Sequence, residues 1–175
     1  TDAASIPVVT LCLGLAAASA ISRIGGISCD LRWPNDVLIN GRKCCGILTQ
    51  LHGPAVVAGI GVNLNHREFP DELASIATSL RIETGNVVQC REKLLAELLD
   101  SIDQHIALLE GRGKQAIFEL FQRASTYAAG RRVQVDTAEG TLLGTTSGLD
   151  AAGFLKLRKD DGTETLILAG GVRPA

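Results

Sequence analysis

An acidic and a basic side chain flank the most strongly predicted turn of the sequence, Asn40-Gly41. Asn-Gly between two apolar runs is typical of a two-residue hairpin, because a type I′ turn requires positive φ at both central residues. If these residues form the whole loop, Leu38 faces Lys43, and two residues earlier Asp36 faces Cys45. Side chains alternate along a strand, so Asp36 and Lys43 lie diagonally on one face, roughly 7–8 Å apart at the backbone. Because their strands are otherwise apolar, we expect this pair to line a pocket.

A third apolar run, residues 55–63, adds an amide near this face. With a three-residue loop at 52–54, Lys43 faces Asn63, and an acid, a cation and an amide converge. A loop of even length would place Asn63 on the other face.

Three glycines interrupt these strands: Gly46, Gly59 and Gly61. Interior glycine weakens a strand and often marks a place where a ligand or another backbone comes close. The spacing equally fits a bulged sheet whose polar residues share no role, and both interpretations stay open here.

The composition indicates one main domain with a hydrophobic core and a small appendage, since 46% of the 175 residues are hydrophobic. Seventeen basic and nineteen acidic residues give a net charge of −2. A nucleic-acid-binding protein carries a basic stripe or a high pI, so DNA is not an expected partner. No helix-turn-helix precedes the core, which argues against a repressor.

The cysteines have no metal-ligand spacing, and their number is odd: Cys12, Cys29, Cys44, Cys45 and Cys90. We expect free, mostly buried thiols in a reducing cytoplasm rather than a disulfide scaffold.

Residues 8–23 are apolar on every side, which is typical of a buried helix. Ser5 and Pro7 form its expected start, and Gly25-Gly26 its end. The run is similar to a signal-peptide core, but it lacks a basic segment before it and is too short and interrupted for a membrane span. We therefore expect an internal helix and no membrane partner.

The remaining elements follow from periodicity. Strands are expected at 28–32, 35–39, 42–51 and 55–64, and helices near 71–75, at 91–110 and at 114–125, with a break at 111–113. After Gly130 the alternating runs 132–136, 141–148, 154–158 and 165–168 predict a small antiparallel barrel of about 45 residues. A unit this small is marginal alone, so it should pack on the main sheet.

The central motifs resemble those of biotin protein ligases. They are Trp33–Asp36, Lys43, Gly46–Leu48 and Gly59–Asn65, in the family's order and at similar separations, followed by Ala77–Leu80. The resemblance implies an α+β fold: residues 1–128 as part of a catalytic domain with a mixed or antiparallel sheet packed with helices, like class II aminoacyl-tRNA synthetases, and residues 129–175 as an SH3-like domain.

The resemblance also implies a reaction. Biotin and ATP form biotinyl-5′-AMP, and a lysine of a biotin carboxyl carrier protein then takes the biotinyl group. Lys43 is the expected cation between carboxylate and phosphate, Asp36 orients it or holds Mg²⁺, and Asn63 binds the adenylate. Arg32, Trp33, Asn35, Gly46, Ile47, Gly59 and Gly61 complete the expected binding site. The same resemblance is compatible with a homodimer.

Two departures from the family pattern stand out. Arg32 replaces the usual lysine, which keeps the charge but changes a point charge to a fork. An Arg/Gly-rich loop that folds over biotin and ATP precedes this region in the family and does not occur in the sequence, although residues 66–71 are a candidate cover for the adenylate. We expect half of a ligase site, with weak biotin binding and poor ligation. The alternatives are a lipoate or octanoyl transferase of the same fold, and a non-catalytic module that docks on a carrier protein.

Overall fold

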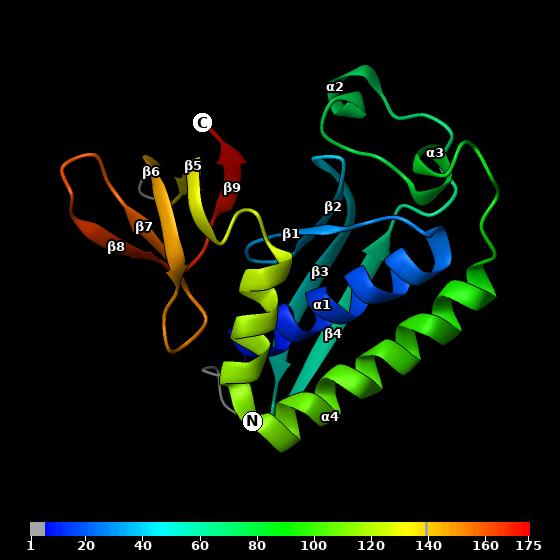
Figure 1. Cartoon of the computed structure of the whole chain (residues 1–175), viewed down its shortest axis with the longest axis horizontal. Coiled ribbons are helices and arrows are strands. Elements are labelled where there is room, and N and C mark those ends of the chain that lie inside the picture. The colour runs from blue at the N-terminus through cyan, green and yellow to red at the C-terminus, as the bar shows by residue number, and fades with distance from the viewer. Residues whose placement is uncertain (1–5, 139) are drawn as a thin grey trace.

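The long helix α1, Ile6–Gly25, lies in the middle of the part of the protein that residues 6–124 form (Figure 1). The computed structural model describes residues 6–138 and 140–175, so the expected start at Ser5 lies outside the described residues. By length and composition α1 is the one described helix that could cross a membrane, but 67% of its apolar window is buried inside the protein. It contacts both the helix α4, Arg91–Ala124, and the strand β3, Arg42–His52, which confirms the predicted internal helix.

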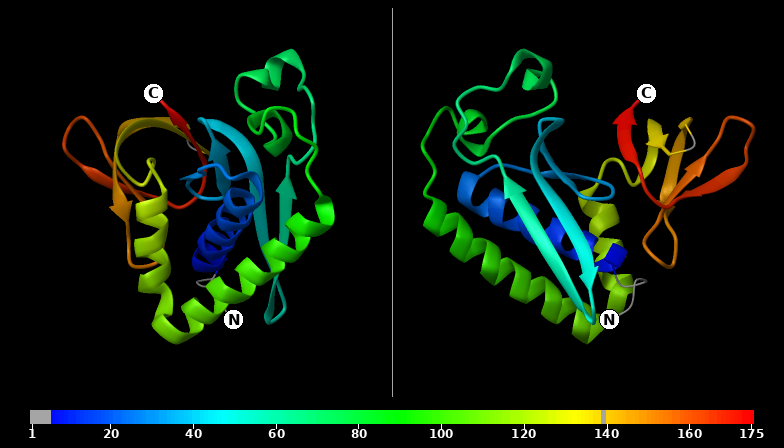
Figure 2. Two further views of the ribbon diagram at one scale, coloured as in Figure 1. Left: turned by 45° about the vertical axis from the view of Figure 1, so that its right-hand side comes forward. Right: turned by 180° about the vertical axis from the view of Figure 1, so that it is seen from behind.

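The first sheet is a four-stranded antiparallel meander in the order β1-β2-β3-β4. Its strands are β1 Asp30–Arg32, β2 Asp36–Ile39, β3 Arg42–His52 and β4 Ala55–Val62. Asn40 and Gly41 have φ values of 50° and 77°, so the predicted two-residue turn is confirmed. Seen from behind, β3 and β4 lie in front of α1 and α4 (Figure 2). Both long helices therefore lie on the same side of the sheet, where α1 contacts β3 and α4 packs on α1.

The strand register differs from the prediction at two points. An irregularity between Val37 and Leu38 places Asp36 opposite Gly46 and not Cys45. The β3–β4 loop has two residues and not three, because His52 pairs with Ala55. Positive φ at a glycine in this loop, Gly53 at 57°, permits the tighter reversal.

Three helices follow β4. They are α2 Asp71–Ala74, α3 Leu80–Glu83 and α4 Arg91–Ala124. Periodicity did not predict α3, which begins at Ser79, whose hydroxyl accepts a hydrogen bond from the Ile82 amide at 3.1 Å. Within α4 the residue Gly113 has φ 76° and ψ 175°, so the expected break between two helical segments is confirmed.

A second antiparallel sheet has the order β8-β7-β6-β5-β9. Its strands are β5 Ala129–Thr137, β6 Gly140–Leu149, β7 Leu155–Arg158, β8 Glu164–Ile167 and β9 Gly171–Pro174. The Trp33 indole donates to the Gly153 carbonyl at 3.1 Å, and the Ser125 hydroxyl donates to the Leu31 carbonyl at 2.5 Å. The first bond attaches the β6–β7 loop of the second sheet to the corner that leads into β2, and the second attaches the end of α4 to β1. A domain boundary at 128/129 stays a prediction.

Candidate active site

The Asp36 carboxylate lies between two cations. The Arg32 guanidinium approaches Oδ2 at 2.7 Å, and the Lys43 ammonium forms an ion pair with Oδ1. The side chains of Asp36 and Arg32 are only 14% and 18% exposed, whereas that of Lys43 is 43% exposed. The two cations and one anion leave a net charge of +1, and the most accessible member of the group is an ammonium.

Gly46 gives the Lys43 side chain its place. The residue stands opposite Asp36, and a Cβ built on it would lie 3.0 Å from both Cε and Nζ of Lys43. A larger residue there would push the ammonium away from the carboxylate. The predicted convergence of Asp36 and Lys43 is therefore confirmed, although the bulge changes the register that produces it.

A shallow groove of about 490 Å³ begins at the Lys43 side chain. It is lined by Asn35, Lys43, Gly46, Ile47, Leu48, Gly59, Ile60 and Gly61. Six of these residues were expected in the site. Leu48 and Ile60 were missed, although strand alternation from Gly46 to Leu48 would have placed Leu48 on the same face. A Cβ on Gly59 would meet nothing within 4 Å, so this stretch of β4 offers open space above bare backbone.

Asn35 and Trp33 differ in their position relative to this groove, because Asn35 lines it and Trp33 does not. The side-chain amide of Asn35 donates to the main-chain carbonyl of Ile47 at 2.7 Å. The main-chain amide of Ile47 donates to the main-chain carbonyl of Asn35 at 2.9 Å. The Trp33 indole is 3% exposed and faces a separate cavity of about 180 Å³. Trp33 thus packs in the core between the two sheets and does not line the groove that Lys43 enters.

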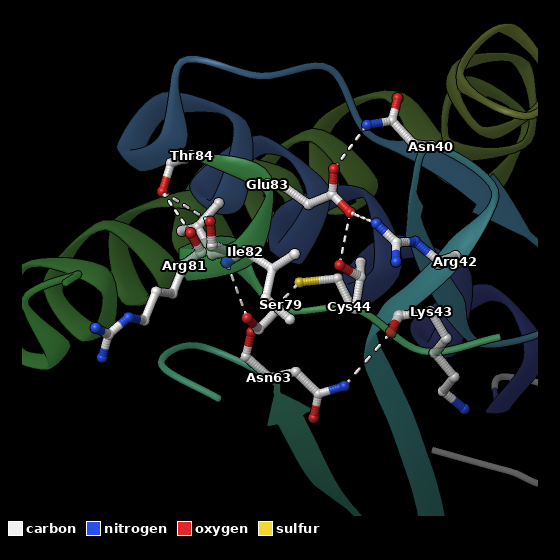
Figure 3. Close-up of polar contacts among 12 residues, drawn as sticks. Asn40, Arg42, Lys43, Cys44, Asn63, Ser79, Arg81, Ile82, Glu83 and Thr84 are labelled. Atoms are coloured by element: carbon white, nitrogen blue, oxygen red, sulfur yellow. Dashed lines mark hydrogen bonds and ion pairs between the residues drawn. The ribbon is translucent and has the colours of Figure 1, made fainter. Parts of the chain in front are cut away.

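Asn63 does not face Lys43 across the sheet as expected. Its amide donates to the Cys44 carbonyl at 2.8 Å, because the two-residue β3–β4 loop shifts the register by one residue. Its side-chain Nδ2 donates to the Lys43 carbonyl at 3.4 Å. The two side chains point in different directions (Figure 3). Asn63 therefore supports the backbone of Lys43 in this structure.

The neighbouring cysteines are free thiols without nucleophilic character. Burial raises the pKa of Cys44 and of Cys45 to about 12, so both stay protonated at neutral pH. The expectation of free thiols is confirmed, although Cys90 is exposed.

The expectation that Asp36 holds Mg²⁺ does not fit this arrangement. Both of its oxygens already face cations, and a third cation would be repelled by Arg32 and Lys43. Among residues 6–138 and 140–175, no three His, Cys, Asp or Glu side chains gather in a group that could hold a metal ion by protein ligands alone.

Comparison with known proteins agrees with this geometry. Residues 1–65 match the Biotin/lipoate A/B protein ligase family, and residues 129–172 match the Biotin protein ligase C terminal domain. The biotin--[acetyl-CoA-carboxylase] ligase of Paracoccus denitrificans is 32% identical over 169 residues, which cover 88% of this chain and 69% of that protein. The chain belongs to the biotin protein ligase family.

Other members of the family show the same pattern. The bifunctional ligase/repressor BirA of Bacillus subtilis is 32% identical over 170 residues, 93% of this chain and 52% of BirA. The chain thus spans about half the length of several curated relatives. A crystal structure of the biotin protein ligase from Aquifex aeolicus has a TM-score of 0.89 at 28% identity, covering 98% of this chain and 76% of that one. This likeness confirms the α+β fold with its C-terminal domain.

Proposed function

We propose that this chain carries the part of a biotin protein ligase that brings the carboxylate of biotin and the α-phosphate of ATP together. The observation that carries the proposal is the Lys43 ammonium, held beside Asp36 and above Gly46 at the head of an open groove. The proposal is also supported by a solved relative, the Aquifex aeolicus ligase in complex with biotin and ATP, at a TM-score of 0.86.

The first half-reaction joins two anions. A biotin carboxylate oxygen attacks the α-phosphorus, the bond to the bridging oxygen breaks, and pyrophosphate leaves, which gives biotinyl-5′-AMP. Negative charge gathers on the phosphoryl oxygens during this step, so a preorganised cation lowers the barrier. Lys43 suits this role because a compact ammonium has three rotatable donors. One donor faces Asp36, and the remaining donors are free to bind both anions.

Asp36 and Arg32 keep that cation in place. Asp36 orients the ammonium, while Arg32 neutralises the second carboxylate oxygen and leaves the group with an excess positive charge. A positive charge at the wall of a concave surface attracts anionic ligands. The bare backbone at Gly59 and Gly61 lets the ligands lie close to the sheet.

The second half-reaction consumes the adenylate. The amine of a carrier lysine attacks the biotinyl carbonyl, the new amide forms, and AMP leaves with the bonding electron pair. The relative in Paracoccus denitrificans is named a biotin--[acetyl-CoA-carboxylase] ligase. By this similarity we take the carrier to be the biotin carboxyl carrier domain of a carboxylase.

The test uses the intact protein expressed from its gene, with ATP, biotin and a biotin carboxyl carrier domain. Pyrophosphate release reports the first step, and the mass of the carrier reports the second. We expect Lys43→Ala to lower the rate of pyrophosphate release by about 100- to 1000-fold, as when one preorganised donor is removed from an anionic transition state. The matched control is Lys156→Ala, because Lys156 pairs with Glu164 at 3.8 Å in the second sheet and does not line the groove.

Three results would contradict the proposal. Unchanged activity of the Lys43→Ala variant would remove the residue from the reaction. A carrier that gains a lipoyl or octanoyl mass would indicate a transferase of the same fold. Carrier binding without any mass change would indicate a non-catalytic docking module.

A further inference from the structure

A second carboxylate, that of Glu83 at the end of α3, lies on the opposite side of the β2–β3 turn from the groove. Its Oε1 accepts hydrogen bonds from the Thr78 hydroxyl at 2.6 Å and from the Arg42 guanidinium at 2.7 Å. Its Oε2 accepts one from the Asn40 amide at 2.7 Å. Figure 3 shows this carboxylate between Asn40 and Arg42. The side chain is only 6% exposed, so water contributes little to its solvation.

The backbone of Lys43 lies between two of these donors. Lys43 follows Arg42 directly, and its amide donates to the Ile76 carbonyl at 2.8 Å. The Thr78 amide donates in turn to the Lys43 carbonyl at 2.9 Å. Lys43 and Ala77 thereby form an isolated parallel bridge between the start of β3 and the loop before α3.

The Glu83 carboxylate is thus shared by both sides of this bridge. Arg42 belongs to the β3 side and Thr78 to the loop side, and both donate to the same oxygen. Burial raises the pKa of Glu83, but the hydrogen bonds from Thr78, Asn40 and Arg42 outweigh it and hold the pKa below its ordinary value of 4.5. Glu83 is therefore ionised at neutral pH, and charge-assisted hydrogen bonds of this kind are short and strong.

We propose that Glu83 is a positioning residue for the reaction in the groove, which rests on the proposed function. By joining Arg42 to Thr78 it fixes the backbone of Lys43 on both sides, and so sets the position from which the Lys43 side chain crosses Gly46 to reach Asp36. Glu83 makes no contact with the groove itself: the residues that line the groove do not include it, and the Lys43 side chain points away from it (Figure 3). Its effect passes through the main chain.

A loss of activity in a Glu83 variant has a second explanation, which is general destabilisation of the fold. A matched ion pair elsewhere in the chain distinguishes this explanation from a positioning role. Glu97 of α4 pairs with Arg23 of α1 at 2.5 Å, with 27% of its side chain exposed. Like Glu83 it joins two distant segments of the chain, but neither partner lines the groove. Replacing each glutamate by glutamine removes one charge in a side chain of the same size, so Glu97→Gln is the control for Glu83→Gln.

The first measurement is residue-resolved amide hydrogen exchange of the intact protein without ligands. We expect exchange of the Lys43 and Thr78 amides to become at least about tenfold faster in Glu83→Gln, because a glutamine amide cannot accept from Asn40 while it accepts from Arg42 and Thr78 through one oxygen. In Glu97→Gln both amides should exchange at the wild-type rate. Unchanged protection in Glu83→Gln would overturn the proposal.

The second measurement is the steady-state rate of pyrophosphate release with biotin and ATP. We expect Glu83→Gln to lower kcat by about 10- to 100-fold, with KM for both substrates changed by less than about threefold, since the variant misplaces a group that acts in the transition state. An equal loss in Glu97→Gln, or an effect on KM alone, would overturn the positioning role.

A second pair of variants guards against misfolding of Glu83→Gln. Thr78→Ser keeps the hydroxyl that donates to Glu83, whereas Thr78→Val removes it at similar size. We expect kcat near the wild-type value in the serine variant and reduced in the valine variant, and the reverse order would contradict the proposal. A wild-type protein that releases no pyrophosphate would refute the proposed function and this catalytic role together. Unchanged hydrogen exchange in an active protein would refute the role of Glu83 alone.

Discussion

Asp36 and Glu83 are two partly buried carboxylates on either side of the same hairpin, and each accepts from an arginine at 2.7 Å. They differ in their remaining partners. Asp36 pairs with an ammonium whose side chain is 43% exposed and that lines a groove. Glu83 instead binds the Asn40 amide and the Thr78 hydroxyl, and Thr78 is fully buried.

The difference indicates that accessibility of the partner, and not burial of the acid, separates the proposed reactive site from the structural one. Lys43 has donors that Asp36 does not use. Gly46 leaves room for its side chain, and the groove that it lines stays open because Gly59 carries no side chain. The donors around Glu83 are used within the protein. We therefore propose different roles for these two similar clusters of charge, the first toward ligands and the second toward the main chain.

The variant with the largest expected effect on this difference between the two carboxylates is one that closes the space beside Lys43. We expect Gly46→Ala to lower kcat for pyrophosphate release by about 100-fold, because its Cβ would lie 3.0 Å from Nζ and displace the ammonium. Gly46 does not have a positive φ, so alanine can adopt its backbone conformation.

The control for this variant is Gly111→Ala in α4, where a Cβ meets nothing within 4 Å. Activity should be unchanged, and the free energy of unfolding should rise by about 0.5–1 kcal/mol because alanine favours a helix over glycine. Wild-type kinetics in Gly46→Ala would show that the ammonium does not need its place beside Asp36.

The contribution of the Glu83 charge is tested by measuring the free energy of unfolding as a function of pH. The folded pKa of Glu83 lies below its ordinary value of 4.5, so its contribution is present above pH 4.5 and is lost as the pH falls through the folded value. We expect Glu83→Gln to lower the free energy of unfolding by about 1–2 kcal/mol at pH 7, and this deficit to shrink below pH 4.5.

Urea unfolding of the wild type and the variant between pH 3 and pH 7 measures this, with buffers spaced about half a unit apart. The Gly111→Ala control changes no titrating group, so its curve should stay parallel to that of the wild type. A deficit that is constant over the whole pH range would contradict the assignment of the effect to the Glu83 charge.

The smallest expected effect concerns the arginine on the Asp36 side. Arg32→Lys keeps the positive charge beside Oδ2, but loses a guanidinium that lies 5.9 Å from the centre of the Tyr127 ring. We expect pyrophosphate release to fall by less than about fivefold and the free energy of unfolding by about 0.5–1 kcal/mol. Arg131→Lys, whose guanidinium lies 4.1 Å over the same ring, is the control and should affect stability alone. A loss comparable to that of Gly46→Ala would make Arg32 an essential part of the site.

Local sequence patterns were sufficient for much of the fold. The Asn40-Gly41 turn, the break at Gly113 and the internal helix α1 all follow from backbone preferences or from apolar periodicity over short stretches. The ion pair of Asp36 and Lys43 could also be predicted from the sequence, because a two-residue turn leaves few registers in which a diagonal pair can form. Leu48, which lines the groove, required only the alternation of residues along β3, whereas alternation along β4 places Ile60 on the other face from its neighbours Gly59 and Gly61.

Other features depend on distant partners. Two features shift the strand register by one residue: the irregularity between Val37 and Leu38, and the two-residue reversal at Gly53-Pro54. A shift of one residue moves a side chain to the other face of the sheet. The placement of Asn63 depended on the second of these features and was wrong for that reason. Trp33 carries no local sign that its indole will bind the Gly153 carbonyl, 120 residues away.

The sequence by itself determined which residue types could do chemistry and the turn that brings an acid and a lysine together, because both are matters of local geometry. Only the tertiary structure decided which carboxylate pairs with a lysine that lines a groove and which one, Glu83, holds the hairpin to α3 across 41 residues from Arg42. The reason is that a buried charge is stable only where separate segments supply its donors, and the segments that meet are set by packing of the whole chain.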